Sequence, residues 1–318
     1  MDNSRIITLS LPTPYPVGDA NAYLLTDGLH HGLVDAGVAG DREYAALMTG
    51  LAAQGLAPAD LEAVAITHAH QDHSGGAVRL AREHGVPLIM QEASYHQLID
   101  QPRARLTWGR AMILYGVPED LLVVWSRFFG GVRSLAAADL APLSLRFVAP
   151  GESFRLGGMD LAPLPTPGHC PDHLCFLVQD RDTAFTGDHL LPAITPNPLL
   201  YFNPLNGFRR TRSLVDYLRS LDALAGAGVS RGLPGHGGEI ACVTDRIAKA
   251  REHISKRTAK LAALVTEDPE ASPFVLSTRL FTVSHPAEQY LALSETVAGL
   301  DLADPDRMAV MDQALCDS

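Results

Sequence analysis

Short apolar runs and longer stretches with helical spacing alternate along this chain of 318 residues. The short runs are typical of buried strands, and they cover residues 6–11, 22–25, 32–34, 61–67, 87–90, 145–148, 161–164, 174–178 and 184–186. Leucines recur three or four residues apart at positions 214, 218, 221 and 224, which predicts a helix over 210–225. Residues 42–54 and 240–266 show the same spacing. Strands mixed with helices in this order predict an α/β fold.

One segment, 67–76, concentrates side chains that bind metals. His68, His70, Asp72 and His73 fall within six residues. Because side chains alternate along an extended segment, His68 and His70 can reach the same cation. Asp72 and His73 follow a tight turn and face a second point. The segment lies on the loop between a strand-like run and a helix expected to start near residue 77, where α/β folds place their chemistry.

This His-X-His-X-Asp-His pattern resembles the signature of the metallo-β-lactamase superfamily. Four further motifs follow the order found in that family: Leu33-Val34-Asp35-Ala36-Gly37, Thr166-Pro167-Gly168-His169, Phe185-Thr186-Gly187-Asp188 and Leu233-Pro234-Gly235-His236-Gly237. The resemblance implies that Asp35 supports the site without binding metal. It also implies two metal sites with these ligands: His68, His70 and His169 in the first, Asp72, His73 and His236 in the second, and Asp188 shared between them.

The donor set agrees with that implication. Imidazole and carboxylate ligands without thiolate suit zinc, and also iron or manganese. Seven protein ligands are too many for one tetrahedral cation, which indicates two divalent metal ions. Two cations about 3.5–4 Å apart can share a water and lower its pKa to about 7, and the bridging hydroxide then attacks a carbonyl carbon. We expect Asp72 or Asp188 to move the proton. Purely structural histidines are disfavoured, because structural zinc sites are closed and often contain cysteine.

The resemblance further implies the architecture. We expect a four-layer αβ/βα sandwich as the catalytic domain over 1–238 and a helical, winged-helix-like domain over 239–318. The opening segment 11–18 and the tail residues His253 and Arg257 are similar to a subgroup that includes β-lactamase-like protein 2 and fungal polyketide-releasing thioesterases. Winged helices often bind DNA, but this tail holds 8 basic and 13 acidic residues. A packing or dimerisation element is therefore favoured, and a homodimer is compatible with it.

Besides the tail, the apolar stretch 93–143 also departs from a minimal hydrolase of this type. It contains both tryptophans, Trp108 and Trp125. Its helical pattern breaks at 116–118 and again at 130–131. Two roles stay open for this insertion. It could roof the metal site and exclude water from an apolar acyl group, or it could pack on the domain or at a dimer interface.

Smaller candidates lie close to the ligand motifs. His173 is either a partner of a ligand or part of the wall of the site, and His189 is either a substrate contact or a packed loop residue. Tyr201 and Phe202 are candidates for an acyl pocket. The cysteines have no paired metal-binding spacing, so free thiols are expected at Cys170, Cys175, Cys242 and Cys316.

Composition excludes several classes of partner. The net charge is −11, with 25 basic and 36 acidic residues, so a dedicated nucleic-acid surface is not expected. The first residues lack the basic and apolar regions of a signal peptide. No run approaches the roughly 20 apolar residues of a membrane span. We therefore expect a cytoplasmic protein with no membrane partner.

Together these observations predict a dinuclear metal-dependent hydrolase. Its expected substrate is a small-molecule thioester or related ester with an apolar acyl group, because a thiolate leaves readily without a strong general acid. A lactonase and a phosphodiesterase or ribonuclease of the same fold are the alternatives. A hydroxyacyl-glutathione substrate, as in glyoxalase II, also stays open. A non-catalytic binding protein is disfavoured, because all seven ligand positions are intact.

Overall fold

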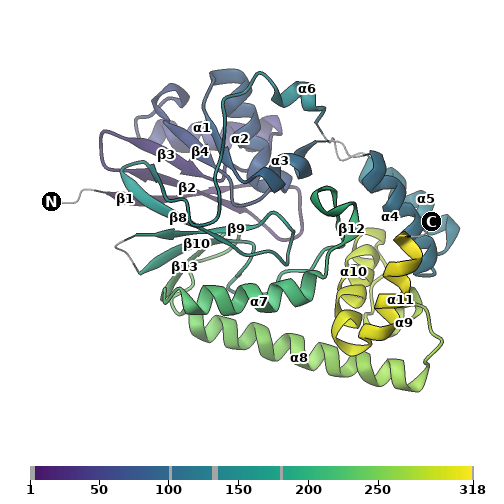
Figure 1. The fold of residues 1–318 in the computed structure, drawn as a ribbon. Coiled ribbons are helices and arrows are strands. Elements are labelled where there is room, and N and C mark those ends of the chain that lie inside the picture. Colours follow the sequence, from purple (N-terminus) through teal and green to yellow (C-terminus); the bar gives the residue numbers. More distant parts are fainter. Residues whose placement is uncertain (1–3, 100–101, 131–134, 180–181, 317–318) are drawn as a thin grey trace.

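Two β-sheets pack face to face in the computed structural model, which describes residues 4–99, 102–130, 135–179 and 182–316 (Figure 1). The first sheet has the order β1-β2-β3-β4-β5-β6, and the second has the order β13-β10-β9-β8-β7. A separate hairpin pairs β11 with β12. The strands are β1 Arg5–Leu11, β2 Ala20–Thr26, β3 His31–Val34, β4 Ala63–Ala65, β5 Leu88–Met90, β6 Leu145–Phe147, β7 Phe154–Leu156, β8 Met159–Pro165, β9 Leu174–Val178, β10 Thr183–Gly187, β11 Phe202–Asn203, β12 Arg209–Arg210 and β13 Arg231–Pro234.

Helices flank both sheets and also form a group of their own at one end of the molecule (Figure 1). They are α1 Asp41–Ala53, α2 Gln71–His84, α3 Glu92–Leu98, α4 Pro102–Leu114, α5 Glu119–Gly130, α6 Ala137–Leu140, α7 Ser213–Gly226, α8 Val243–Glu267, α9 Pro273–Leu280, α10 Pro286–Ala303 and α11 Pro305–Cys316. The helices expected over 42–54, 210–225 and 240–266 are α1, α7 and α8. The first break expected in the insertion separates α4 from α5, whereas residues 131–134 at the second break lie outside the described residues.

Strand β2 shows how the layers form, because it is buried along its whole length. Its alternate residues serve two cores, as the two-residue period of a strand requires. Leu24 faces a core shared with α1 and α2, and Leu25 faces a core between the two sheets. On the outer side of the second sheet, α7 and α8 cover Ala184 of β10. The predicted four-layer αβ/βα sandwich is confirmed.

Parallel strand pairs bring the ligand motifs together. Strands β3 and β4 are parallel in the first sheet, and β10 and β13 are parallel in the second. Carboxyl ends of parallel strands meet at one edge of a sheet, which is where α/β folds bind ligands. Each of the loops that follow β4, β10 and β13 carries predicted metal ligands.

Helix α2 begins earlier than the sequence indicates. We expected it to start near residue 77, after Gly75 and Gly76, which are poor helix formers, but it begins at Gln71. Both glycines are needed because the helix lies against the loop after β3. A Cβ on Gly76 would lie 2.0 Å from the carbonyl oxygen of Ala36. Close packing therefore overrides helix propensity here, and it places Asp72 in the first helical turn.

The insertion and the tail share one hydrophobic core. Trp125 of α5 is fully buried, donates its indole N–H to the carbonyl oxygen of Pro286 at 2.8 Å, and contacts Tyr290 of α10 edge-to-face. Met112 of α4 and Leu293 of α10 belong to the same core. We call the group formed by α4, α5, α9, α10 and α11 the helical unit. Packing on the tail accounts for the buried apolar residues of the insertion, and its expected roles as a roof or as part of a dimer interface stay predictions.

The described part of the tail consists of helices and the loops that join them, up to Cys316. No strand follows β13 in that part of the chain, so the expected winged-helix likeness is limited to helices. Among the described residues, no helix combines the length and the apolar composition needed to cross a bilayer.

Candidate metal centre

All seven predicted ligands converge at the edge where the two sheets meet the helical unit. They come from separate elements: His68 and His70 from the loop after β4, Asp72 and His73 from the first turn of α2, His169 from the loop between β8 and β9, Asp188 from the residue after β10, and His236 from the residues after β13. Six of the seven are buried, and His70 is partly exposed. The centre is therefore enclosed by protein and opens beside His70.

Three imidazoles form a first triad. The Nδ1 atom of His70 lies 2.9 Å from Nε2 of His68 and 3.0 Å from Nε2 of His169. These three atoms have the spacing of a group that can hold a metal ion.

Two imidazoles and a carboxylate form a second triad. His236 Nε2 lies 3.4 Å from Asp72 Oδ2, and His73 Nε2 lies 3.9 Å from Asp72 Oδ1. These residues also meet the spacing of a metal site.

Asp188 lies between the two triads. Its Oδ1 atom is 3.5 Å from His73 Nε2 and 3.6 Å from His236 Nε2. Its other oxygen, Oδ2, is 3.6 Å from His169 Nε2 in the first triad. One carboxylate therefore offers one oxygen to each triad, which is the arrangement of a bridging ligand.

The ring nitrogen of each histidine that points away from the centre has an oxygen partner. These contacts are His68 Nδ1 to Thr67 Oγ1 at 3.0 Å, His70 Nε2 to Tyr201 Oη at 2.5 Å, His73 Nδ1 to Asp35 Oδ2 at 2.9 Å, His169 Nδ1 to the Asn197 carbonyl at 2.9 Å, and His236 Nδ1 to the Asp19 carbonyl at 2.9 Å. A carbonyl or carboxylate oxygen accepts only, so the outward nitrogens of His73, His169 and His236 carry the proton. When these rings are neutral, their inward nitrogens present lone pairs to the centre.

The inward atoms fit a cation. His73 Nε2, His236 Nε2 and Asp188 Oδ1 are fully buried and make no hydrogen bond among the described residues. Buried polar atoms without partners are costly. In the first triad, one proton on His70 Nδ1 can serve only one of the two imidazole nitrogens that lie about 3 Å from it. A divalent cation in each triad would satisfy both requirements, and the partner on the outward nitrogen is the arrangement that orients metal-binding histidines.

Protonation states in the first triad also suit metal binding, which requires neutral imidazole and ionised carboxylate. Burial lowers the pKa of His70 to about 3, and the ring of His169 acts in the same direction. Burial likewise holds the pKa of His68 well below its usual value. For Asp188, burial raises the pKa, but His73 and His169 outweigh it and hold the carboxyl ionised.

The second triad lies among carboxylates. Burial acts to lower the pKa of His73, yet Asp188, Asp35 and Asp72 together raise it well above its usual value. The pKa of His236 is raised in the same way, against burial, by Asp72 and Asp188. Without a metal, this region therefore favours a proton, which indicates that it favours positive charge.

Two backbone positions allow this close approach. Asp35 has a φ of 58°, and this turn lets its carboxylate accept from the Thr67 amide at 2.7 Å while it contacts His73. At Gly235, a Cβ would lie 2.3 Å from Asp188 Oδ1. Any larger residue there would displace the bridging carboxylate.

Several contacts around the centre were not evident from the sequence. Asn197 acts through its backbone carbonyl, which every residue type has, so no sequence signal marks it. Asp172 is buried and accepts from the amide of Ala69, which lies between His68 and His70, at 2.8 Å.

His173 and His189 were candidates from the sequence. His173 lies behind Asp188 and accepts from its amide at 3.0 Å. His189 is a buried loop residue packed against Tyr217.

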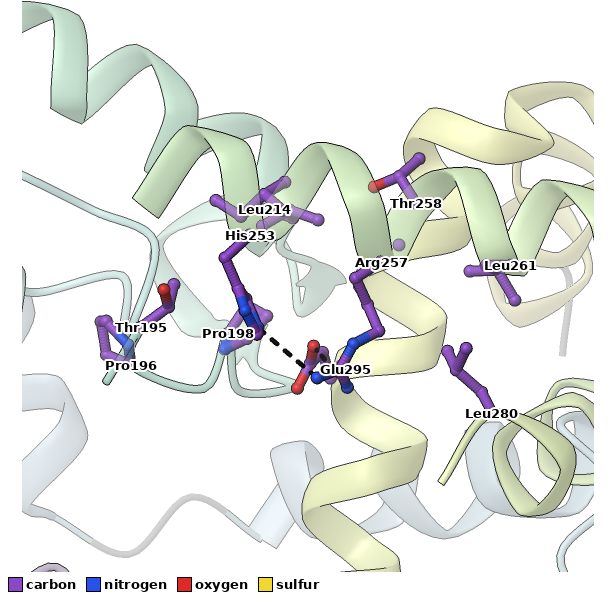
Figure 2. A pocket seen from close by; sticks show the side chains of 12 residues that line it. Thr195, Pro196, Pro198, Leu214, His253, Arg257, Thr258, Leu261, Leu280 and Glu295 are labelled. Atoms are coloured by element: carbon purple, nitrogen blue, oxygen red, sulfur yellow. Dashed lines mark hydrogen bonds and ion pairs between the residues drawn. The ribbon is translucent and has the colours of Figure 1, made fainter. Parts of the chain in front are cut away.

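A pocket lies on the far side of the loop that contacts His169 (Figure 2). Thr195, Pro196 and Pro198 line one side, and the Arg257–Glu295 ion pair, 3.3 Å long, lines the other. None of the seven predicted ligands lines this pocket.

Comparisons with known proteins agree with this geometry. Residues 15–236 match the family model described as the metallo-beta-lactamase superfamily. A protein of Bacillus subtilis strain 168 named "Probable metallo-hydrolase YqjP" is 30% identical over 96% of this chain and 94% of its own length. The thioesterase pkgB of Emericella nidulans is 30% identical, but over only 51% of this chain and 48% of its own. The crystal structure of a metallo-beta-lactamase family protein from Thermus thermophilus is similar, with a TM-score of 0.79 and 28% identity over 95% of this chain and 94% of the other.

Proposed function

The chain belongs to the metallo-beta-lactamase superfamily and is a metallo-hydrolase of that family; we propose that it uses two metal ions to hydrolyse a thioester or related ester with an apolar acyl group. The observation that carries the proposal is the position of Asp188 between two separate triads, with one oxygen toward each. In this proposal, His68, His70 and His169 hold one cation, and Asp72, His73 and His236 hold the other.

When bound, two such cations polarise a carbonyl oxygen and lower the pKa of water. Zinc suits the donor set, and iron or manganese can replace it.

Within this centre the two carboxylates have different roles. Asp188 is enclosed between the triads, and the neighbouring histidines hold its pKa low, so it stays ionised and fixes the spacing of the triads. Asp72 lies close to the β1–β2 loop. Tyr15 in that loop donates its hydroxyl to Gln71, the residue before Asp72, at 3.4 Å. Burial, and then the charge of Asp72, raise the pKa of Tyr15. We assign the transfer of the proton from the attacking water to a carboxylate oxygen of Asp72.

The chemistry of the chain supports a thioester. A thiolate is a stable leaving group, so the reaction requires a base for the water but no strong acid for the leaving sulfur. Exposed apolar side chains occur on the two loops next to the ligands: Tyr15 and Val17 before Asp19, and Ile194 after Asp188. These can cover an apolar acyl group. The name of the fungal relative, a thioesterase, points in the same direction.

The test is hydrolysis of a panel of acyl thioesters of rising chain length, followed with a thiol-reactive dye before and after chelation. We expect chelator-sensitive cleavage that favours bulky apolar acyl groups, and no cleavage by Asp72→Ala. The matched control is His84→Ala, at the other end of α2, where the side chain is exposed. Cleavage of lactones or phosphodiesters in place of thioesters would overturn the substrate assignment, and chelator-resistant cleavage would overturn the metal assignment.

A further inference from the structure

One short segment, 197–201, supplies two of the outer contacts of the first triad. The carbonyl oxygen of Asn197 accepts from His169 Nδ1, and the hydroxyl of Tyr201 contacts His70 Nε2. The amide of Leu199 also donates to the carbonyl of His169 at 3.3 Å. The orientation of two of the three histidines in this triad therefore depends on where the segment lies.

The helical unit holds that segment. Asn197 Nδ2 donates to the Leu291 carbonyl at 3.2 Å, and Ser294 Oγ donates to the Pro198 carbonyl at 2.9 Å, so both of these contacts are made with α10. Leu200 and Phe202 are buried in the core of the helical unit. Side chains that flank Tyr201 on both sides thus anchor in the helices, while Tyr201 itself points to the metal centre.

A buried ion pair fixes the hairpin that follows. Arg210 of β12 pairs with Asp301 of α10 at 2.7 Å and with Asp312 of α11 at 2.8 Å. The guanidinium and the Asp301 carboxylate are each 1% exposed, so the pair is desolvated and geometrically demanding. The segment is therefore bound to the tail both at α10 and through the hairpin.

The other side of the segment is less closely packed. The pocket of Figure 2 separates Thr195, Pro196 and Pro198 from the side chains of α8. The hydrogen bonds that hold residues 197 and 198 are made with α10.

We propose that Tyr201 and Asn197 are positioning residues for His70 and His169, and that the helical unit thereby sets the affinity of the first triad for its cation. The inference rests on the proposed function, since it requires each triad to bind a metal. Partners on the outward nitrogen of a metal-binding histidine typically change metal affinity about 10–100-fold. The outer contacts of the second triad, Asp35 and Asp19, belong to the sandwich and its loops, so this triad is independent of the helical unit.

The test uses Tyr201→Phe, which removes the hydroxyl and keeps the ring. The matched control is Tyr44→Phe, because Tyr44 is buried in the sandwich core and its hydroxyl makes no hydrogen bond among the described residues. Each substitution is made in two backgrounds. Asp72→Ala disables the second triad and leaves the first, and His169→Ala does the reverse. Cobalt titration, followed by its absorbance, measures the affinity of the triad that remains.

We expect Tyr201→Phe to weaken cobalt binding about 10–100-fold in the Asp72→Ala background and to leave it unchanged in the His169→Ala background. The absorbance bands of cobalt in the first triad should also shift. Equal weakening in both backgrounds, or none in either, would overturn the inference. If Tyr201→Phe does not fold, Ser294→Ala gives the same comparison. Absence of cobalt binding in both parent variants would instead count against the proposed function.

Discussion

The two triads of the candidate centre are built by different parts of the molecule. The second triad is oriented by Asp35 at the end of β3 and by Asp19 in the loop before β2, both within the sandwich. The first triad takes two of its three outer contacts from Tyr201 and Asn197, in a segment held by the helical unit. The sandwich thus suffices to form one half of the centre, and the other half needs the insertion and the tail as well.

The helical unit therefore holds the segment that contacts the first triad, which is a different role from covering the site as a roof. Buried residues of the insertion, such as Trp125, pack on α10 through Tyr290. Helix α10 in turn holds the segment beside His169 through Ser294 and Leu291. A continuous set of contacts therefore joins the insertion to His169, a proposed metal ligand.

The largest effect is expected from Asp188→Ala, because this carboxylate contacts both triads. Removing it should release both metals at low chelator concentration and reduce hydrolysis to the rate in buffer. The measurement is metal content after dialysis, together with thioester turnover. Loss of only one metal would show that Asp188 holds the cation of a single triad and does not bridge the two.

Asp35→Asn should affect the second triad more than the first, because Asp35 contacts His73 directly but reaches His68 only through Thr67. The Asp35 carboxylate accepts three hydrogen bonds, from the Thr67 amide, the Thr67 hydroxyl and His73 Nδ1. An asparagine tolerates the φ of 58°, but its NH₂ group must face one of these donors. We expect the metal affinity of the second triad to fall about 10–100-fold, with a smaller fall in the first triad. Cobalt titration in the His169→Ala and Asp72→Ala backgrounds measures the two affinities, and an effect on the first triad of equal size would contradict the division.

The smallest effect is expected from Ser294→Ala, which removes one hydrogen bond to the Pro198 carbonyl. A buried hydrogen bond contributes about 0.5–1.5 kcal/mol, so the affinity of the first triad should fall by no more than about tenfold. Ser277→Ala is the control, since Ser277 is a buried serine of α9 that bonds within its own helix. Cobalt affinity that falls equally in the two variants would point to general loosening of the tail.

The sequence predicted which side chains lie close together most directly where the residues are neighbours in the chain. His68, His70, Asp72 and His73 follow a strand directly, so local geometry alone brings them together. The order of apolar runs indicated strands mixed with helices, and the family resemblance implied the four-layer fold. The start of α2 was missed because it depends on the packing of Gly76 against Ala36, a contact between segments far apart in the chain.

The outer contacts were harder to predict, for a physical reason. Tyr201 is separated from His70 by 131 positions, and the contact requires the hairpin, α10 and the insertion to be packed first. The sequence marked Tyr201 only as a candidate for an acyl pocket. Asn197 contributes a backbone carbonyl, so its residue type carries no signal. Residue type predicts the ligands, whereas only the assembled fold shows what orients them.

The central claim is that two cations bind, one in each triad. The most direct measurement is the metal content of the purified protein by atomic emission, beside His169→Ala and His236→Ala, which each remove one ligand of a different triad. We predict two metals per chain in the parent protein and one in each variant. A single metal in the parent protein, or loss of all metal from His169→Ala or His236→Ala while the fold stays intact, would contradict the account.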